Sequence, residues 1–185
     1  PSLMVTGSHI PDDRNGIKFN KPSGEVLKDD EQGILGQNPV LNDSLFDQQE
    51  NLLKSDYLPT LNAEIETQYI QRYLDFFPAD TLASLKIGVY QHSSVARELM
   101  PKIFKGLGAE VINLAWSDVF ISVDTEAIRP EDVELAAKWS KEYGFDCIIS
   151  TDGDADRPLV SDENGEWLRG DVAGILVAKY LQADA

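Results

Sequence analysis

The hydrophobic pattern changes near residue 60, where a regular alternation of short apolar runs and longer helical patterns begins. Three apolar runs have the length of buried strands: 85–90, 109–114 and 147–150. Three segments carry apolar residues at helical spacing: 62–77, 95–107 and 130–143. Pro78, Gly108 and Gly144 follow these segments and Pro130 begins the third, as is typical of helix boundaries.

Shorter elements are expected on both sides of this alternation. Before it, the pattern predicts strands at 3–5 and 17–19, a turn at 21–25, a short helix at 29–35 and a polar stretch to about 60. After it, the pattern predicts a hairpin of 158–161 and 167–168 around a turn at 162–165, then a helix at 172–181. Three packing expectations follow: residues 3–5 form a buried strand, Asp171 caps the last helix, and Val133, Ala136, Ala137 and Trp139 form the buried side of the helix at 130–143.

Strands that alternate with helices of this length predict βαβ units. Such units build a mainly parallel sheet with helices on both faces, and the added hairpin makes the sheet a mixed one. The expected fold class is therefore α/β. In sheets of this kind the chemistry gathers in the loops at the carboxyl ends of strands.

The composition bounds the class of protein. The chain has 185 residues, 42% of them hydrophobic, which is enough for a real core in one or two domains. The single cysteine, Cys147, lies in an apolar run, so no intrachain disulfide is possible and a buried, inert thiol is expected. This favours a reducing, cytoplasmic location. No run of about 18 apolar residues is present, so we expect no membrane partner.

The charge is strongly acidic. The formal net charge is −16, from 32 acidic and 16 basic residues. Such a field repels nucleic-acid backbones, so we expect no nucleic-acid partner. It also disfavours anionic substrates, so any phosphate chemistry would need a bound cation or a few local lysines and arginines.

The segment DGDADR at 152–157, directly after the third predicted strand, carries the clearest chemical signal. Asp152, Asp154 and Asp156 alternate with small residues, so the backbone can curl and turn the three carboxylates toward one centre. Carboxylates this close repel one another and raise each other's pKa, so they require a cation. All-oxygen ligands suit Mg²⁺ or Ca²⁺ rather than zinc.

Two other interpretations of this segment are a solvated acidic turn and an EF-hand calcium loop. Its place after a buried strand opposes the first. For the second, the aspartates match positions one, three and five and Glu163 falls at position twelve, but Arg157 stands where glycine is required, and the flanks are not helices. Three carboxylates suit Mg²⁺ better than Ca²⁺, because Mg²⁺ commonly takes water and substrate phosphate as further ligands.

A second candidate is Ser8, in the segment TGSHIP at 6–11. Gly-Ser-His also occurs in remnants of purification tags, but the strand-like residues ahead of it oppose that origin. Ser8 and His9 are adjacent and do not easily form a nucleophile and base pair, and no Gly-x-Ser-x-Gly elbow surrounds the serine. The serine could carry a phosphate, which would supply a further metal ligand, or it could be an ordinary turn residue.

Three segments together, TGSHIP at 6–11, NGIK at 15–18 and DGDADR at 152–157, resemble the phosphoserine and metal loops of the α-D-phosphohexomutases, the phosphomannomutase and phosphoglucomutase superfamily. The two loops in this order, joined by a βαβ domain, are highly specific. The usual serine loop has Ala before Ser and Asn after His, where this chain has Gly7 and Ile10. That difference concerns subgroup and substrate more than chemistry, since the hydroxyl and the imidazole are kept.

The resemblance implies a Mg²⁺-dependent enzyme of the isomerase class that interconverts hexose 1-phosphate and 6-phosphate. Phosphorylated Ser8 would give its phosphoryl group to the hexose phosphate substrate and take a phosphate back from a hexose bisphosphate intermediate. Arg157 would contact the serine phosphate, and Lys18 or His9, with Lys18 preferred, would transfer protons. The implied residues are Ser8, Asp152, Asp154 and Asp156 for the metal, and Ser8, His9, Lys18 and Arg157 for catalysis.

The resemblance also implies how the chain is organised. Members of the superfamily have four domains, and residues 1–60 resemble the C-terminal part of domain 1, 61–168 domain 2, and 169–185 the start of domain 3. One complete domain and parts of its two neighbours are therefore expected, with the missing domains of the same enzyme as partners and no turnover by this chain alone. Mannose, glucose and glucosamine phosphates stay open as substrates, and a non-catalytic metal- or phosphate-binding module is the alternative.

Overall fold

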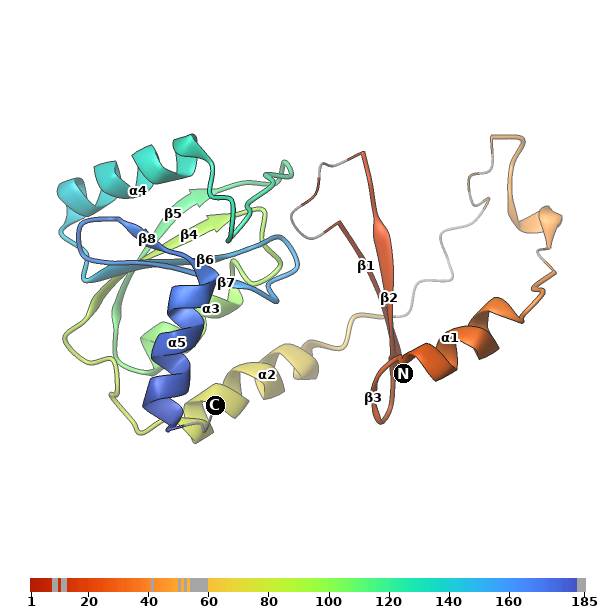
Figure 1. Cartoon of the computed structure of the whole chain (residues 1–185), viewed down its shortest axis with the longest axis horizontal. Helices are drawn as coiled ribbons and strands as arrows, with labels where there is room; N and C mark the ends of the chain where they lie inside the picture. Colours follow the sequence, from red (N-terminus) through yellow and green to blue (C-terminus); the bar gives the residue numbers. More distant parts are fainter. Residues whose placement is uncertain are drawn as a thin grey trace.

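The computed structural model describes residues 1–7, 10, 13–40, 42–49, 51, 53 and 60–182, and contains a small hairpin sheet and a larger α/β unit (Figure 1). The elements in chain order are β1 (Ser2–Thr6), β2 (Gly16–Lys21), β3 (Gly24–Glu25), α1 (Lys28–Leu35), the short 3-10 helix η1 (Asp43–Leu45), α2 (Ala63–Phe76), β4 (Lys86–His92), α3 (Leu99–Gly106), β5 (Glu110–Trp116), α4 (Pro130–Tyr143), β6 (Cys147–Thr151), β7 (Pro158–Ser161), β8 (Trp167–Leu168) and α5 (Gly170–Leu181).

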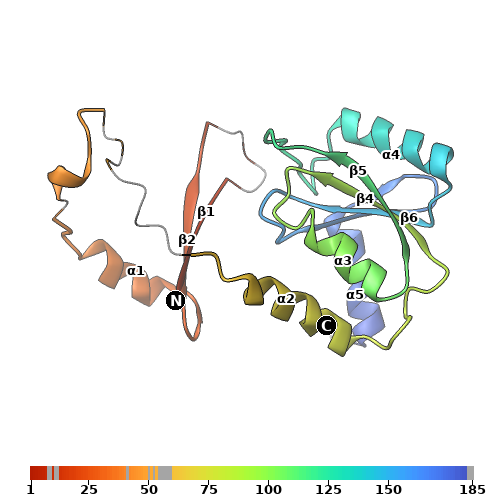
Figure 2. The ribbon, with the colours of Figure 1, turned by 180° about the vertical axis from the view of Figure 1, so that it is seen from behind.

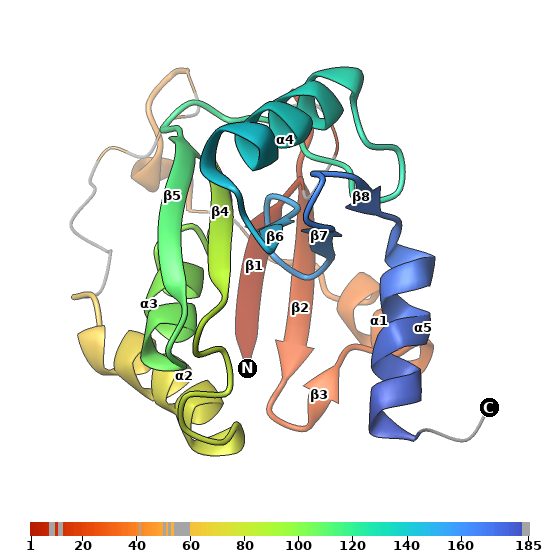
Figure 3. The same ribbon diagram turned by 90° about the vertical axis from the view of Figure 1, so that its left-hand side faces the viewer.

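The larger unit is built on a five-stranded sheet of order β5-β4-β6-β7-β8 (Figure 3). Strand β4 lies between β5 and β6 and runs parallel to both, and the β7–β8 hairpin is added antiparallel to β6. The three strands from the predicted βαβ units are thus parallel, and the hairpin makes the sheet mixed. The expected α/β fold class is confirmed.

The core lies on both faces of this sheet. On one face, Trp139 of α4 packs with Tyr90 of β4 and the fully buried Leu159 of β7. On the other face, Met100 of α3 packs against Ile87 and Val89 of β4. Because β4 is buried on both faces, its sequence is apolar at consecutive positions and does not alternate. Helix α2 lies against α3 on the outer side, where Lys102 pairs with Glu66 (Figure 2).

The boundaries of α2 and α4 agree with the sequence, and the buried side of α4 agrees in part, because Ala136 and Trp139 are buried as expected. Residues 132, 136, 139 and 140 form that side, whereas Val133 and Ala137, expected there, are exposed. The buried carboxylate of Asp132 accepts hydrogen bonds from Arg129, at 2.8 Å to each oxygen, and from the Tyr90 hydroxyl at 3.1 Å. A hydrophobic pattern does not predict Asp132 on the buried side, because Asp132 is a charged residue whose burial is compensated by these partners.

Helix α3 begins at Leu99, four residues later than the spacing predicts. The segment before it makes other hydrogen bonds. The Val95 N–H donates to the Gly153 carbonyl at 3.0 Å, and the Ser94 hydroxyl accepts the Ala96 N–H at 3.1 Å. These two N–H groups already bond to groups outside the helix, so the regular helical hydrogen bonds begin only after them.

The last helix, α5, starts differently from the sequence expectation. Its N-cap residue is Arg169, and Asp171, the predicted cap, lies in the first turn and accepts the N–H of Val172 at 2.9 Å. The helix is apolar, yet the side chains of Ile175 and Tyr180 are 67% and 79% exposed. Among the described helices, none combines the length and apolar character needed to cross a bilayer.

The small sheet consists of β1, β2 and β3, paired antiparallel with Leu3 opposite Phe19. Both strands predicted in this region are confirmed, as is the turn before Gly24, whose positive φ of 131° suits glycine. The expected burial of residues 3–5 is wrong, because Leu3 and Val5 are each 68% exposed. The apolar residues of β1 predicted a layer of packing partners over the strand, and the described part of the chain places none over Leu3 and Val5.

Candidate functional site

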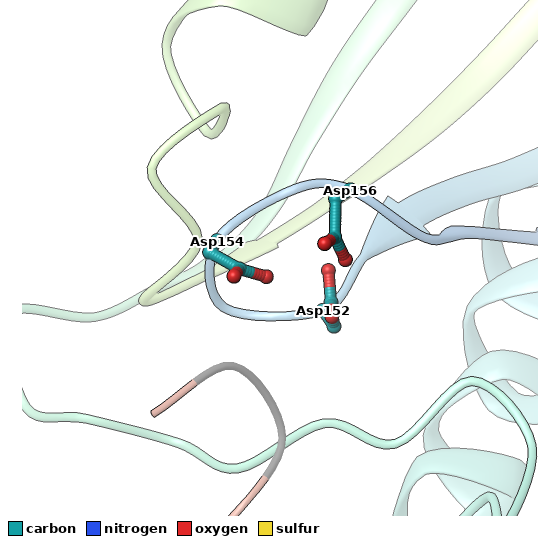
Figure 4. Close-up of side chains that lie close together, drawn as sticks. All are labelled: Asp152, Asp154 and Asp156. Carbon is teal, nitrogen blue, oxygen red and sulfur yellow. The ribbon is translucent and has the colours of Figure 1, made fainter. Parts of the chain in front are cut away.

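The acidic loop of residues 152–157 links β6 to β7 at the carboxyl end of β6. Asp152 is fully buried, Asp154 is 8% exposed, and the side chain of Asp156 is 51% exposed. One carboxylate oxygen from each of the three lies within 4.8 Å of one from each of the others. The three side chains point toward a common centre inside the loop (Figure 4), so the predicted convergence is confirmed.

The backbone of the loop explains this convergence. The Ala155 N–H donates to the carbonyl of Asp152 at 3.3 Å, and Ala155 adopts a left-handed conformation with φ of 63°. At the neck, the Asp152 N–H donates to the Arg157 carbonyl at 3.3 Å, and the Arg157 N–H donates to the Asp152 carboxylate at 3.3 Å. The small residues Gly153 and Ala155 let the chain curl this tightly.

Lys18 reaches this loop from β2, as the site prediction requires. Its ammonium nitrogen lies 2.8 Å from an oxygen of Asp154 and 2.8 Å from an oxygen of Asp156. The hydroxyl of Thr6, on the neighbouring strand β1, donates to the same oxygen of Asp154 at 3.0 Å. The hydrogen bonds that Lys18 donates to the two carboxylates raise its pKa above the usual range, so the lysine is protonated here.

Arg157 is the last residue of the loop, and its side chain is partly exposed. Its nitrogen atoms lie 3.7 Å from a carboxylate oxygen of Glu126 and 3.9 Å from one of Asp156. At these distances the pairs are loose, and the fork of donors is available to an anion. Ser8 and His9, the other two predicted catalytic residues, lie outside the described residues.

A cleft of about 230 Å³ separates the hairpin sheet from the acidic loop. Gly7 and Asn15 line it from the hairpin side, Ser93 and Phe120 line it from the loops after β4 and β5, and Asp154 lines it from the acidic loop. Gly7 directly precedes Ser8 in the sequence. The two motifs identified in the sequence therefore border one cleft.

Two buried residues beside the acidic loop were not predicted, His92 and Ser94. Nε2 of His92 lies 2.9 Å from the carbonyl oxygen of Thr151, the residue before Asp152, and the Ser94 hydroxyl lies 2.7 Å from that of Thr151. A carbonyl only accepts, so Nε2 carries the ring proton, and burial lowers the pKa of His92 and keeps the ring neutral. The signal that could have found them is the polar run at 91–94 directly after an apolar strand.

Comparison with known proteins gives three consistent findings. Residues 67–165 match the model of the phosphoglucomutase/phosphomannomutase alpha/beta/alpha domain II. Over its whole length the chain is 48% identical to a phosphomannomutase of Salmonella muenchen, and the match covers 37% of that protein. Over 98% of its length it is 49% identical to a phosphomannomutase of Sinorhizobium fredii, and the match covers 38% of that protein. The chain thus spans little more than a third of these relatives' length.

The fold comparison agrees with the sequence comparison. A crystal structure of a phosphoglucomutase/phosphomannomutase family protein from Burkholderia thailandensis superposes with a TM-score of 0.70. The match covers 98% of this chain and 37% of that one, at 24% sequence identity. At this identity the match speaks for the fold alone.

Proposed function

Because the chain belongs to the phosphoglucomutase/phosphomannomutase family, we propose that it carries the serine and metal loops of a phosphohexose mutase. The proposed reaction interconverts hexose 1-phosphate and hexose 6-phosphate through phosphorylated Ser8 and a hexose bisphosphate. Mannose phosphate is the first substrate to test, because both relatives described above are named phosphomannomutase. Since the chain spans 37% and 38% of those relatives, the activity is proposed for a longer protein that includes it.

One observation carries this proposal: the two motifs meet in space. Lys18 belongs to the segment that follows Ser8, Asp154 belongs to the acidic loop, and their side chains lie 2.8 Å apart although 136 residues separate them in sequence. A hairpin and a loop that come together only in the fold, around a cleft, are typical of a site that transfers a group between them.

The acidic loop fits a small divalent cation. Its three side chains offer only oxygen, the ligand type that Mg²⁺ prefers, and the Lys18 ammonium already stands in as a cation between Asp154 and Asp156. We assign Asp152, Asp154, Asp156 and the phosphate of Ser8 as the Mg²⁺ ligands. Bound Mg²⁺ would supply positive charge to the phosphoryl oxygens in the transition state.

The chain's own residues have distinct proposed tasks in the transfer. As the bond between Ser8 Oγ and phosphorus breaks, a sugar hydroxyl oxygen bonds to phosphorus and its proton must leave. Lys18, in preference to His9, is proposed to give a proton from its ammonium to Ser8 Oγ as that bond breaks and then, as the amine, to take the proton of the sugar hydroxyl. Its ammonium lies at the loop where the phosphoryl group would be held. Arg157 is proposed to hold the Ser8 phosphate with its guanidinium fork.

The proposed division of the chain follows the same assignment. Residues 1–60 would belong to domain 1 of the mutase, 61–168 to domain 2, and 169–185 to the start of domain 3. The match of residues 67–165 to domain II supports the middle boundaries. The remaining domains would complete the substrate site, so we expect no turnover from the 185-residue chain alone, and measurable mutase activity of that chain would contradict this expectation.

The test of the function is phosphate on Ser8. In the full-length protein, mass spectrometry should find a phosphorylated Ser8 that loses its phosphate when mannose 1-phosphate and Mg²⁺ are added, with a hexose bisphosphate formed in equal amount. Ser8→Ala should abolish both signals, whereas Ser23→Ala, in the exposed turn before β3, should keep them. An unmodified Ser8 together with no Mg²⁺-dependent transfer to any hexose phosphate would instead favour a non-catalytic binding module.

A further inference from the structure

The acidic loop and the loop between β4 and α3 leave the sheet from adjacent parallel strands. Strand β4 pairs with β5 on one side and with β6 on the other, so the chain turns away in opposite directions after β4 and after β6. Such a switch point opens a crevice at the carboxyl ends of the two strands. Residues of the β4–α3 loop are therefore well placed to act on the acidic loop.

A directional chain of hydrogen bonds crosses this crevice. The Ala96 N–H donates to the Ser94 hydroxyl at 3.1 Å, and the Thr151 hydroxyl donates to the carbonyl of Asp152 at 2.8 Å. The Thr151 proton is used in that bond, so in the 2.7 Å contact between the two hydroxyls Ser94 is the donor. The β4–α3 loop is thus connected through two side chains to the carbonyl that begins the turn of the acidic loop.

Two further contacts fasten the same loops. Nε2 of His92 donates to the carbonyl of Thr151 at 2.9 Å, and the Val95 N–H donates to the carbonyl of Gly153 at 3.0 Å. Ser94 and His92 are fully buried and Thr151 is 9% exposed, so water does not compete for these bonds. The carbonyls of residues 151 and 153 are thus held directly from the β4 side, and that of residue 152 is held through the Thr151 hydroxyl, to which Ser94 donates.

This arrangement opposes the repulsion among the three carboxylates. Like charges within 4.8 Å drive the loop to open, and an open loop would present its oxygens at larger and more variable distances. Mg²⁺ demands near-ideal octahedral geometry, whereas Ca²⁺ accepts irregular and larger sites. A loop held from behind is therefore suited to the smaller ion.

We propose that Ser94, His92 and Thr151 are positioning residues that hold the acidic loop in its closed form and so select Mg²⁺ over Ca²⁺. The inference rests on the proposed function, which supplies the cation. Thr151 bonds to the carbonyl of Asp152 in the loop, and Ser94 and His92 act through Thr151. All three would affect the ion only through Asp152, Asp154 and Asp156.

Calorimetric titration of the full-length protein with MgCl₂ and, separately, CaCl₂ tests the proposal. Ser94→Ala and Thr151→Val should each weaken Mg²⁺ binding by about 10- to 100-fold, the usual effect of losing an outer partner of a metal ligand, and should weaken Ca²⁺ binding much less. The double variant should be little weaker than either single variant, because both break one chain of bonds. A merely structural role would lower affinity for both ions together.

Ser140→Ala is the matched control, because Ser140 is another buried serine and its hydroxyl has no partner within the described part of the chain. It should leave the Kd for Mg²⁺ unchanged. If Ser94→Ala and Thr151→Val also leave both affinities unchanged while the wild type binds Mg²⁺, the positioning role is wrong.

Hydrogen exchange of the metal-free protein separates this inference from the proposed function. Ser94→Ala should speed exchange of the amides at 152–157 and leave those of β4 and β5 unchanged. Faster exchange there in a protein that does not bind Mg²⁺ would overturn the metal function and keep the positioning role. Unchanged exchange would overturn the positioning role itself.

Discussion

The ammonium nitrogen of Lys18 lies 2.8 Å from a carboxylate oxygen of Asp154, across 136 residues of sequence. This contact joins the hairpin sheet to the acidic loop and places a positive charge where a metal ion is proposed. The same ammonium also contacts Asp156 at 2.8 Å. Lysine and the proposed metal would therefore compete for two of the three carboxylates.

Lys18→Met should tighten Mg²⁺ binding, because it removes a competing cation from the ligands. The two partly exposed ion pairs are together worth about 0.4–2 kcal/mol, so the Kd should fall by a factor of about two to thirty. Calorimetry measures this directly. Lys21→Met is the control, since Lys21 lies on the same strand and pairs with Asp30 at 2.5 Å, away from the loop. Weaker Mg²⁺ binding in Lys18→Met would contradict the competition.

Asp154→Asn should weaken Mg²⁺ binding at least about tenfold, because a neutral amide replaces a nearly buried anionic ligand. The exposed Asp118 on the loop after β5 serves as control, and Asp118→Asn makes the same change in net charge. Equal affinity in both variants would show that only the overall charge matters. The measurement is the Kd for Mg²⁺ at fixed ionic strength.

His92 should make the protein less stable in mild acid. Burial lowers the pKa of His92 below its ordinary value of 6.5, so the unfolded chain binds a proton that the folded protein does not. Its contribution is present above pH 6.5 and is lost as the pH falls from there toward the folded-state pKa. In His92→Gln, the midpoint of urea unfolding should fall less between pH 7 and pH 5 than in wild type. If the midpoint falls equally in both proteins, His92 is not the source of the acid sensitivity.

Two glycines should respond in opposite directions to alanine. Gly165, in the turn between β7 and β8, has φ of 80°, and an added Cβ would lie 2.4 Å from the carbonyl oxygen of Ala136. Gly165→Ala should therefore lower the free energy of unfolding by about 2 kcal/mol or more. Gly174 lies inside α5 with nothing within 4 Å of an added Cβ, so Gly174→Ala should raise it by about 0.5–1 kcal/mol. Urea unfolding measures both, and effects of equal sign would contradict the argument.

The acidic loop shows what local pattern can predict. Asp152, Asp154 and Asp156 stand at alternate positions directly after a buried strand. The convergence of their side chains follows from that spacing, and the location of the loop at the carboxyl end of β6 follows from the strand before it. The position of Lys18 does not follow from spacing, because no periodicity links residues 136 positions apart. It was expected only because the two segments together resemble a known family.

Two of the errors, the buried side of α4 and the start of α3, have a common physical cause, which is polar groups that are satisfied inside the fold. Asp132 lies on the buried face of α4 because Arg129 and Tyr90 pair with its carboxylate. Ser94 delays the start of α3 because its hydroxyl accepts the Ala96 N–H and bonds to Thr151, while the neighbouring Val95 N–H donates to the acidic loop. Hydrophobic periodicity assigns polar residues to the surface, so it fails where partners compensate their burial.

The antiparallel ladder between β6 and β7 also constrains insertions and deletions. Thr151 pairs with Pro158 at the neck of the acidic loop, and the next inward-facing residues of β7, Leu159 and Ser161, are buried. One residue added or lost between 152 and 157 would either bulge the neck or shift β7 by one position and turn Leu159 toward solvent. Relatives should therefore keep the length of this loop as strictly as its aspartates.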